Sequence, residues 1–163
     1  MIDCFCIRNN YNFDLEVIDR SIILYQDLSD WMEEYGLPET YDVSITTSTG
    51  VSKTITLSVQ SKNKLTDQDL GFNYGFQDGI YCFTIISCGK TYMRSRAIIP
   101  ALECCLKSAY VTLPDSDFTK LEKISHFIES AKNHAELNNY KNAKDSFRIA
   151  RELLDKLKCD CNC

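Results

Sequence analysis

Residues 112–121 read TLPDSDFTKL, and the spacing of apolar residues changes at Pro114 within this stretch. Before Pro114, apolar and polar residues alternate in short runs, as they do in β-strands with one buried face. After it, apolar residues recur every three or four positions, as on the buried face of an amphipathic helix. The change predicts an α+β chain with a β-rich part followed by a helical part.

Strands are predicted at several places before residue 100. Residues 15–25 contain one or two strands, and residues 43–47 and 51–59 form a hairpin with one solvated face. Residues 80–86 are apolar on both faces, which favours a central strand, and residues 91–99 alternate as its half-exposed partner. We therefore predict an antiparallel β-sandwich of immunoglobulin-like proportions.

Three helices are predicted after the strands. Pro100 suits the first position of a short helix at about 100–111, which would cover one end of the sheet with Cys104 and Cys105 in its core. Two longer helices follow, and their apolar stripes are Leu121, Ile124, Ile128, Ala131 and Ala135, then Tyr140, Ala143, Phe147, Ala150, Leu154 and Leu157. Because alanines let two backbones approach closely, these helices should form an antiparallel αα-hairpin.

The ends of the two longer helices have their own signals. Asp115, Ser116 or Asp117 is expected to cap the first, and Leu137-Asn138-Asn139 separates it from the second. The predicted organisation is a β-rich domain over residues 1–112, a helical hairpin over 113–158 and a cysteine-rich tail over 159–163.

Length and charge limit the classes of function. A chain of 163 residues can bury a core without a cofactor or disulfide. The net charge of −5 and the pI near 5.0 disfavour sequence-specific nucleic-acid binding, which needs a clustered basic face. Residues 1–30 show no signal-peptide pattern, and residues 21–28 are too short and too polar to span a bilayer. We expect a protein that stays in a cytoplasm and does not use a membrane.

The nine cysteines are an odd number, so they cannot all pair within one molecule. Without an export signal, reduced thiols or metal ligands are expected before disulfides. Cys159, Cys161 and Cys163 alternate at the end of the chain, where three thiolates could bind one Zn²⁺ with Cys104, Cys4 or a histidine as fourth ligand. The alternative is a tail of reduced thiols. No cofactor other than this zinc ion is predicted.

No set of catalytic residues is recognisable. The chain lacks the G-x-S-x-G elbow and the glycine-rich nucleotide motifs. His126 and His134 lie off the apolar stripe without a second ligand nearby, and we interpret them as solvated helix residues. An enzyme is the least expected class, and no catalytic residue is assigned.

Two charged stretches suggest a contact between copies of the chain. Residues 27–42 hold six acidic side chains and no Lys or Arg, whereas residues 90–96 carry three basic ones. The interface hypothesis names Asp27, Asp30, Trp31, Glu33 and Glu34 on the acidic side and Lys90, Arg94 and Arg96 on the basic side. Ordinary solvated surfaces are the alternative. If the contact is heterologous and the rotation closes, the copies form a ring.

Three stretches carry a resemblance to a known group of proteins. They are Trp31-Met32-Glu33-Glu34-Tyr35-Gly36-Leu37-Pro38-Glu39-Thr40-Tyr41-Asp42-Val43, then Asp78-Gly79-Ile80-Tyr81-Cys82-Phe83, and the ending Cys159-Asp160-Cys161-Asn162-Cys163. In order and composition the chain resembles small virion proteins of crAss-like tailed phages. The resemblance implies a structural subunit of the tail or of the head–tail neck, one of the ring proteins stacked below the portal. It brings no catalytic residues.

The resemblance also implies partners and a location. The partners would be other copies in a homo-oligomeric ring and neighbouring neck and tail proteins, with the portal as a candidate. The location would be the virion, and the host cytoplasm during assembly. Two alternatives stay open: a monomeric adaptor whose hairpin binds a partner helix, and a zinc-stabilised regulatory protein.

Overall fold

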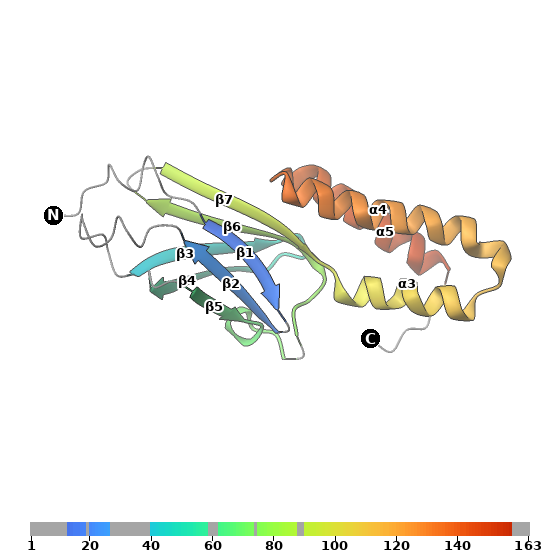
Figure 1. Ribbon diagram of the computed structural model, residues 1–163, viewed down its shortest axis with the longest axis horizontal. Helices are drawn as coiled ribbons and strands as arrows, with labels where there is room; N and C mark the ends of the chain where they lie inside the picture. The colour runs from blue at the N-terminus through green and yellow to red at the C-terminus, as the bar shows by residue number, and fades with distance from the viewer. Residues whose placement is uncertain are drawn as a thin grey trace. The chain divides into compact units, whose positions relative to one another are not determined.

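The computed structural model describes residues 13–18, 20–26, 40–58, 62–73, 75–87 and 90–157 (Figure 1). Within them the protein is mixed α+β, with antiparallel sheets of three and four strands and a C-terminal helix pair. The strands are β1 (Phe13–Ile18), β2 (Ser21–Gln26), β3 (Thr40–Thr47), β4 (Ser52–Ser58), β5 (Lys62–Thr66), β6 (Gly79–Ser87) and β7 (Lys90–Ile98). The helices are α3 (Pro100–Thr112), α4 (Phe118–Glu136) and α5 (Tyr140–Lys156), with the 3-10 turns η1 (Gln68–Leu70) and η2 (Asp115–Asp117). The predicted α+β class is confirmed.

The chain divides into two compact units, which are described separately. The first comprises Met1–Thr46, Gly50–Phe76 and Cys82–Arg94, and the second comprises Thr47–Thr49, Gln77–Tyr81 and Ser95–Cys163. Within the second unit, Ser48 binds Ile80: its backbone N–H donates to Ile80 O and its hydroxyl accepts from Ile80 N, both at 2.9 Å. Helix α3 belongs to the second unit together with α4 and α5.

The three-stranded sheet has the order β1-β2-β5 and buries one face. Leu15 lies opposite Leu24, and Ile22 lies opposite Leu65, all in antiparallel pairs. These four leucine and isoleucine side chains are buried, whereas Glu16 on the other face is exposed. The predicted strand region at 15–25 is therefore two strands. Strand β5 was not predicted.

The four-stranded sheet has the order β4-β3-β6-β7. Strands β3 and β4 form the predicted hairpin, in which Val43 pairs with Ile55. Val43 and Ile45 are buried while Ser44 between them is exposed, so this hairpin has one solvated face. Strand β6 is central, as predicted, and its buried residues are Ile80, Tyr81, Cys82, Phe83 and Ile85.

A buried carboxylate organises the loop after β5 in the first unit. Asp67 accepts hydrogen bonds from Arg20 Nε at 2.9 Å and from the backbone N–H of Gly75 at 2.7 Å, and it forms an ion pair with Arg20. The hydrogen bond from Arg20 holds the pKa of Asp67 below its ordinary value, although burial acts in the opposite direction. These contacts join the turn between β1 and β2 to the loop that follows β5.

Another carboxylate caps α3 in the second unit. Pro100 is the first helical residue, as predicted, and Ile99 at the N-cap position offers no side-chain acceptor. Asp78 supplies it instead, because its two oxygens accept from Ala101 N at 2.9 Å and Leu102 N at 2.7 Å. Two of the backbone N–H groups at the start of α3 are thus satisfied by a residue that lies before β6.

The N-termini of α4 and α5 are capped in different ways. Asp117 is the N-cap residue of α4, but its side chain forms no capping hydrogen bond, contrary to the prediction. The 3-10 turn η2 leads into the helix instead. At the start of α5, Asn139 Oδ1 accepts from Asn142 N at 3.2 Å, which is a regular N-cap.

The turn between α4 and α5 is tied to the end of β7 that belongs to the same unit. Asn138 has a left-handed backbone with a φ of 58°, and its Oδ1 accepts from Ser95 N at 2.9 Å. The buried hydroxyl of Ser95 donates to Ala135 O at 2.8 Å. Both groups of Ser95 therefore bind the C-terminal end of α4 and its turn.

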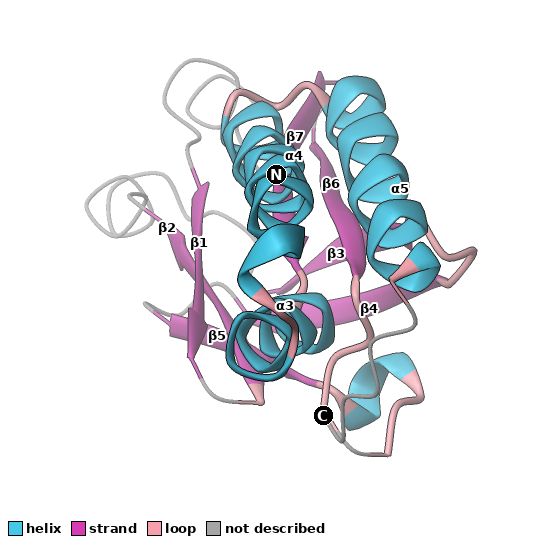
Figure 2. Cartoon of the chain, turned by 90° about the vertical axis from the view of Figure 1, so that its right-hand side faces the viewer, coloured by secondary structure: helices cyan, strands magenta, loops and turns pink. Residues whose placement is uncertain are grey.

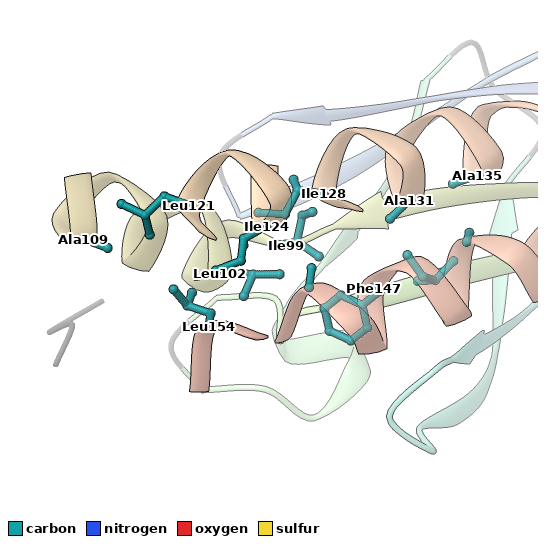
Figure 3. Close-up of a cluster of buried hydrophobic side chains, with 13 residues drawn as sticks. Ile99, Leu102, Ala109, Leu121, Ile124, Ile128, Ala131, Ala135, Phe147 and Leu154 are labelled. Carbon is teal, nitrogen blue, oxygen red and sulfur yellow. The ribbon is translucent and has the colours of Figure 1, made fainter. Parts of the chain in front are cut away.

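The helices share one apolar core (Figure 3). Every residue of the predicted first stripe is buried, and in the second stripe Tyr140 and Leu157 are half-buried. Helix α3 contributes Leu102 and Ala109. Helices α4 and α5 lie side by side in both views (Figure 1, Figure 2), with Ala131, Ala143 and Ala150 fully buried. Residues of this size permit the close approach that the sequence predicted.

Candidate docking groove

A groove of about 300 Å³ lies on the helical unit, between the first turns of α4 and the last turn of α5. Its lining consists of Lys120, Lys123 and Ile124 from α4 and of Leu153, Lys156 and Leu157 from the C-terminal end of α5. The groove therefore combines three apolar side chains with three ammonium groups.

Helix geometry explains why these residues meet. Each helix contributes positions i, i+3 and i+4, which share one face of an α-helix. Ile124 is 1% exposed and joins the core of the unit, while Leu153 and Leu157 are half-buried at its border. The long apolar stems of lysine can lie along such a surface while the ammonium group stays in water.

The electrostatics of the groove favour a negatively charged occupant. Lys120 Nζ lies 3.7 Å from Asp117 Oδ1, and the lysine side chain is 68% exposed, so this ion pair is weak. Among the described residues, Lys123 and Lys156 form no ion pair. The positive end of the α4 helix dipole and the negative end of the α5 helix dipole both lie at the groove, so they offset each other and the lysines set its charge. The arrangement can bind a segment that is both acidic and apolar.

The basic residues of the interface hypothesis lie on β7, an edge strand among the described strands. Arg94 and Arg96 are half-buried and two residues apart, so they share one face of the strand, and Arg94 Nη1 donates to Met93 O at 3.0 Å. Lys90 is the first residue of β7. Asp27, Asp30, Trp31, Glu33 and Glu34 lie outside the described residues. The interface therefore stays a prediction.

The described cysteines lie in different surroundings, and Cys4, Cys6 and Cys88 lie outside the described residues. Cys159, Cys161 and Cys163 of the metal hypothesis lie outside the described residues. Cys104 is exposed and disulfide-bonded, so its predicted place in the core is wrong, and it is not available as a fourth zinc ligand. Cys105 packs half-buried against the helical core. Cys82 is free, and burial raises the pKa of its thiol.

The two histidines have the predicted solvent-facing positions on α4. His126 is exposed, with its ring 5.6 Å from that of Phe127, and His134 is half-buried. Within the described part of the chain, no three His, Cys, Asp or Glu side chains are placed to hold a metal ion.

No protein-family model, curated protein or solved structure matches this chain. Within the described residues, none of the helices combines the length and apolarity needed to cross a bilayer. Sequence reasoning missed the groove because each triad looks like an ordinary helix surface until the pairing of α4 and α5 brings the two together.

Proposed function

We propose that this protein is a structural subunit of a tailed-phage virion, which forms an oligomeric ring in the neck or tail through contacts between subunits. The observation that carries the proposal is the lysine-bordered apolar groove, because it offers a built surface for docking a neighbouring chain. The resemblance to small virion proteins of crAss-like phages supports the same role. The partners would be further copies and adjacent neck or tail proteins, including the portal, in the virion and in the host cytoplasm during assembly.

We further propose that the fold is an antiparallel β-sandwich followed by an antiparallel αα-hairpin. Each sheet of the first unit has buried aliphatic residues on one face, such as Leu24 in one and Ile45 in the other, which supports a β-sandwich. The three-residue connection between α4 and α5 supports an antiparallel αα-hairpin. A rigid sandwich together with a helical hairpin gives a subunit two kinds of surface, as contacts with its own copies and with another layer require.

The ring would be built from one heterologous contact repeated around an axis. An acidic surface of one copy would meet a cationic surface of the next, which fixes the direction of the ring and its register. The charge of the chain supports such a contact, because residues 1–114 hold 14 acidic and 9 basic side chains while residues 115–158 hold 8 and 9.

The same groove favours a second candidate, a monomeric adaptor that binds a partner helix along α4 and α5. The zinc-stabilised regulatory protein remains the third candidate, and metal analysis of the purified chain would test it, with a zinc-to-protein ratio near zero excluding it.

Mass and imaging separate the first two candidates. We expect light scattering to report a multiple of 18.7 kDa and electron microscopy to show closed rings of the purified chain, or a ring of it in the neck or tail of assembled particles. A chain that stays near 18.7 kDa at all concentrations and is missing from assembled particles would refute the ring and favour the adaptor.

A further inference from the structure

We propose that the groove binds the acidic segment 27–42 of a second copy of this chain. The inference rests on the proposed function and names the contact between copies. It replaces β7 with the groove as the cationic surface that receives this segment.

Charge complementarity carries the assignment. The groove presents Lys120, Lys123 and Lys156, and two of these form no ion pair among the described residues. Segment 27–42 has six acidic side chains and neither Lys nor Arg. Asp42 lies in β3 and accepts a hydrogen bond from Thr56 Oγ1 at 2.6 Å, so the other five acids are the ones that would meet the lysines. Opposite charges at the border of a contact steer the encounter and fix its register.

Apolar complementarity selects this segment over a purely acidic one. Ile124, Leu153 and Leu157 line the groove, and burying the surface that Leu153 and Leu157 still expose is favourable. The segment contains Trp31, Met32, Tyr35 and Leu37 among its acids. Tryptophan and tyrosine are the residues that most often dominate binding energy when they fill a pocket.

Topology of assembly favours a second copy as the source of the segment. Each copy carries both this groove and the acidic segment, so every contact leaves a free groove at one end and a free segment at the other. A contact of this kind continues from copy to copy until the rotation closes. A two-fold symmetric dimer, in contrast, would use the same patch on both copies and would not need two different surfaces.

The first experiment measures the contact without requiring a ring. The probe is a synthetic peptide of residues 27–42, titrated into the full chain with Trp31→Phe, so that the peptide carries the only tryptophan in the sample. We expect saturable binding that weakens as salt is raised. Reversing the groove charges with Lys120→Glu, Lys123→Glu and Lys156→Glu should lower the affinity at least about tenfold.

A matched control has the same change in net charge on exposed residues that do not line the groove: Lys53→Glu, Lys107→Glu and Lys141→Glu. It should bind the peptide within about twofold of the parent chain, because distant surface charges are screened. The helical circular dichroism of both variants verifies that they fold. The inference is overturned if the control loses as much peptide affinity as the groove variant, or if the groove variant binds the peptide as tightly as the parent chain.

Reversal of the basic strand tests the competing surface. If Arg94→Glu with Arg96→Glu abolishes peptide binding while the groove variant binds normally, the acidic segment docks on β7 and the inference is wrong. Loss in the groove variant together with binding by the strand variant supports the groove.

A charge exchange tests whether the segment comes from another copy. The groove variant should not associate alone, because its groove and its segment are both acidic. A segment variant with Asp30→Lys, Glu33→Lys and Glu34→Lys should not associate alone either, because its groove and its segment are both basic. Mixing the two should restore association by light scattering. The Trp31 fluorescence of the unmodified chain is then followed on dilution. If it does not change, although added peptide still competes for the groove, the segment docks within its own chain. That result would overturn the assignment to a second copy.

The outcomes separate this inference from the proposed function. If rings form but the peptide does not bind the groove, the inference fails and the ring remains. If the peptide binds the groove while no particle or solution contains rings, the docking contact holds and the ring function fails.

Discussion

Replacing Asp78 should weaken the helical unit, because this carboxylate caps α3 from outside the helix. In Asp78→Ala, the N–H groups of Ala101 and Leu102 lose acceptors at 2.9 and 2.7 Å. An N-cap is worth about 0.5–2 kcal/mol, and the two hydrogen bonds place the loss of stability at the upper end, at about 2 kcal/mol. Asp78→Asn keeps one acceptor oxygen, so we expect its free energy of unfolding to fall by about 1 kcal/mol.

The assay is urea unfolding followed by helical circular dichroism. For a chain of this size, with a slope of roughly 2 kcal/mol per molar urea, the midpoint should fall by about 1 M in Asp78→Ala and by about half as much in Asp78→Asn. Variants whose midpoints equal that of the parent chain, or an Asn variant weaker than the Ala variant, would refute the capping role.

The pH dependence of this site has a definite sign. Burial raises the pKa of Asp78 although the hydrogen bonds from Ala101 and Leu102 lower it. The folded chain therefore holds this proton more tightly than the unfolded chain, whose carboxyl has a pKa of about 3.9. Stability from Asp78 is full below that value and declines as the pH rises through the folded-state pKa. The advantage over Asp78→Ala should thus be larger at acidic than at neutral pH.

Three further predictions concern other contacts. Because Arg20 lowers the pKa of Asp67, the stability that Asp67 contributes should be present above pH about 3.9 and be lost as the pH falls through the folded-state pKa. Asp67→Asn should remove this acid sensitivity, measured as unfolding curves between pH 5 and 2.5. Ala131→Leu should destabilise the helix pair by about 1–3 kcal/mol in urea unfolding, since Ala131 is fully buried, and an unchanged midpoint would contradict close packing there. Asn138→Ala should cost about 2 kcal/mol in urea unfolding through the lost bond from Ser95 and the left-handed backbone. Asn138→Gly should cost about 1 kcal/mol, because it loses the same bond but accepts that backbone; equal losses would mean that the backbone conformation does not matter.

The helices were predictable in detail because each one carries its burial pattern locally. All five residues of the stripe from Leu121 to Ala135 are buried, and the break at Leu137–Asn139 lies between α4 and α5. Strand β6 was equally clear, since it is apolar on both faces. In these cases the sequence period and the buried face coincide, so tertiary contacts strengthen a local preference.

Strand β5 and the cap of α3 were not predictable in the same way. Strand β5 reads KNKLT, and Leu65 is its one apolar residue; it is a strand because β2 offers a pairing edge and Ile22 lies opposite Leu65. Asp78 precedes α3 by more than twenty residues, so no local capping pattern includes it. Both features depend on partners that are distant in sequence.

The groove shows the limit of arguments from net charge. The chain carries a charge of −5, and the helical residues 115–158 are nearly balanced, yet three lysines gather at one end of α4 and α5. A duplex nucleic acid needs many phosphate contacts to release its counterions, and the apolar floor of Ile124, Leu153 and Leu157 makes none. The overall negative field also repels a long polyanion, whereas a short acidic segment with its own apolar residues can use both parts of the lining. Local placement of charge thus favours an acidic peptide segment over nucleic acid.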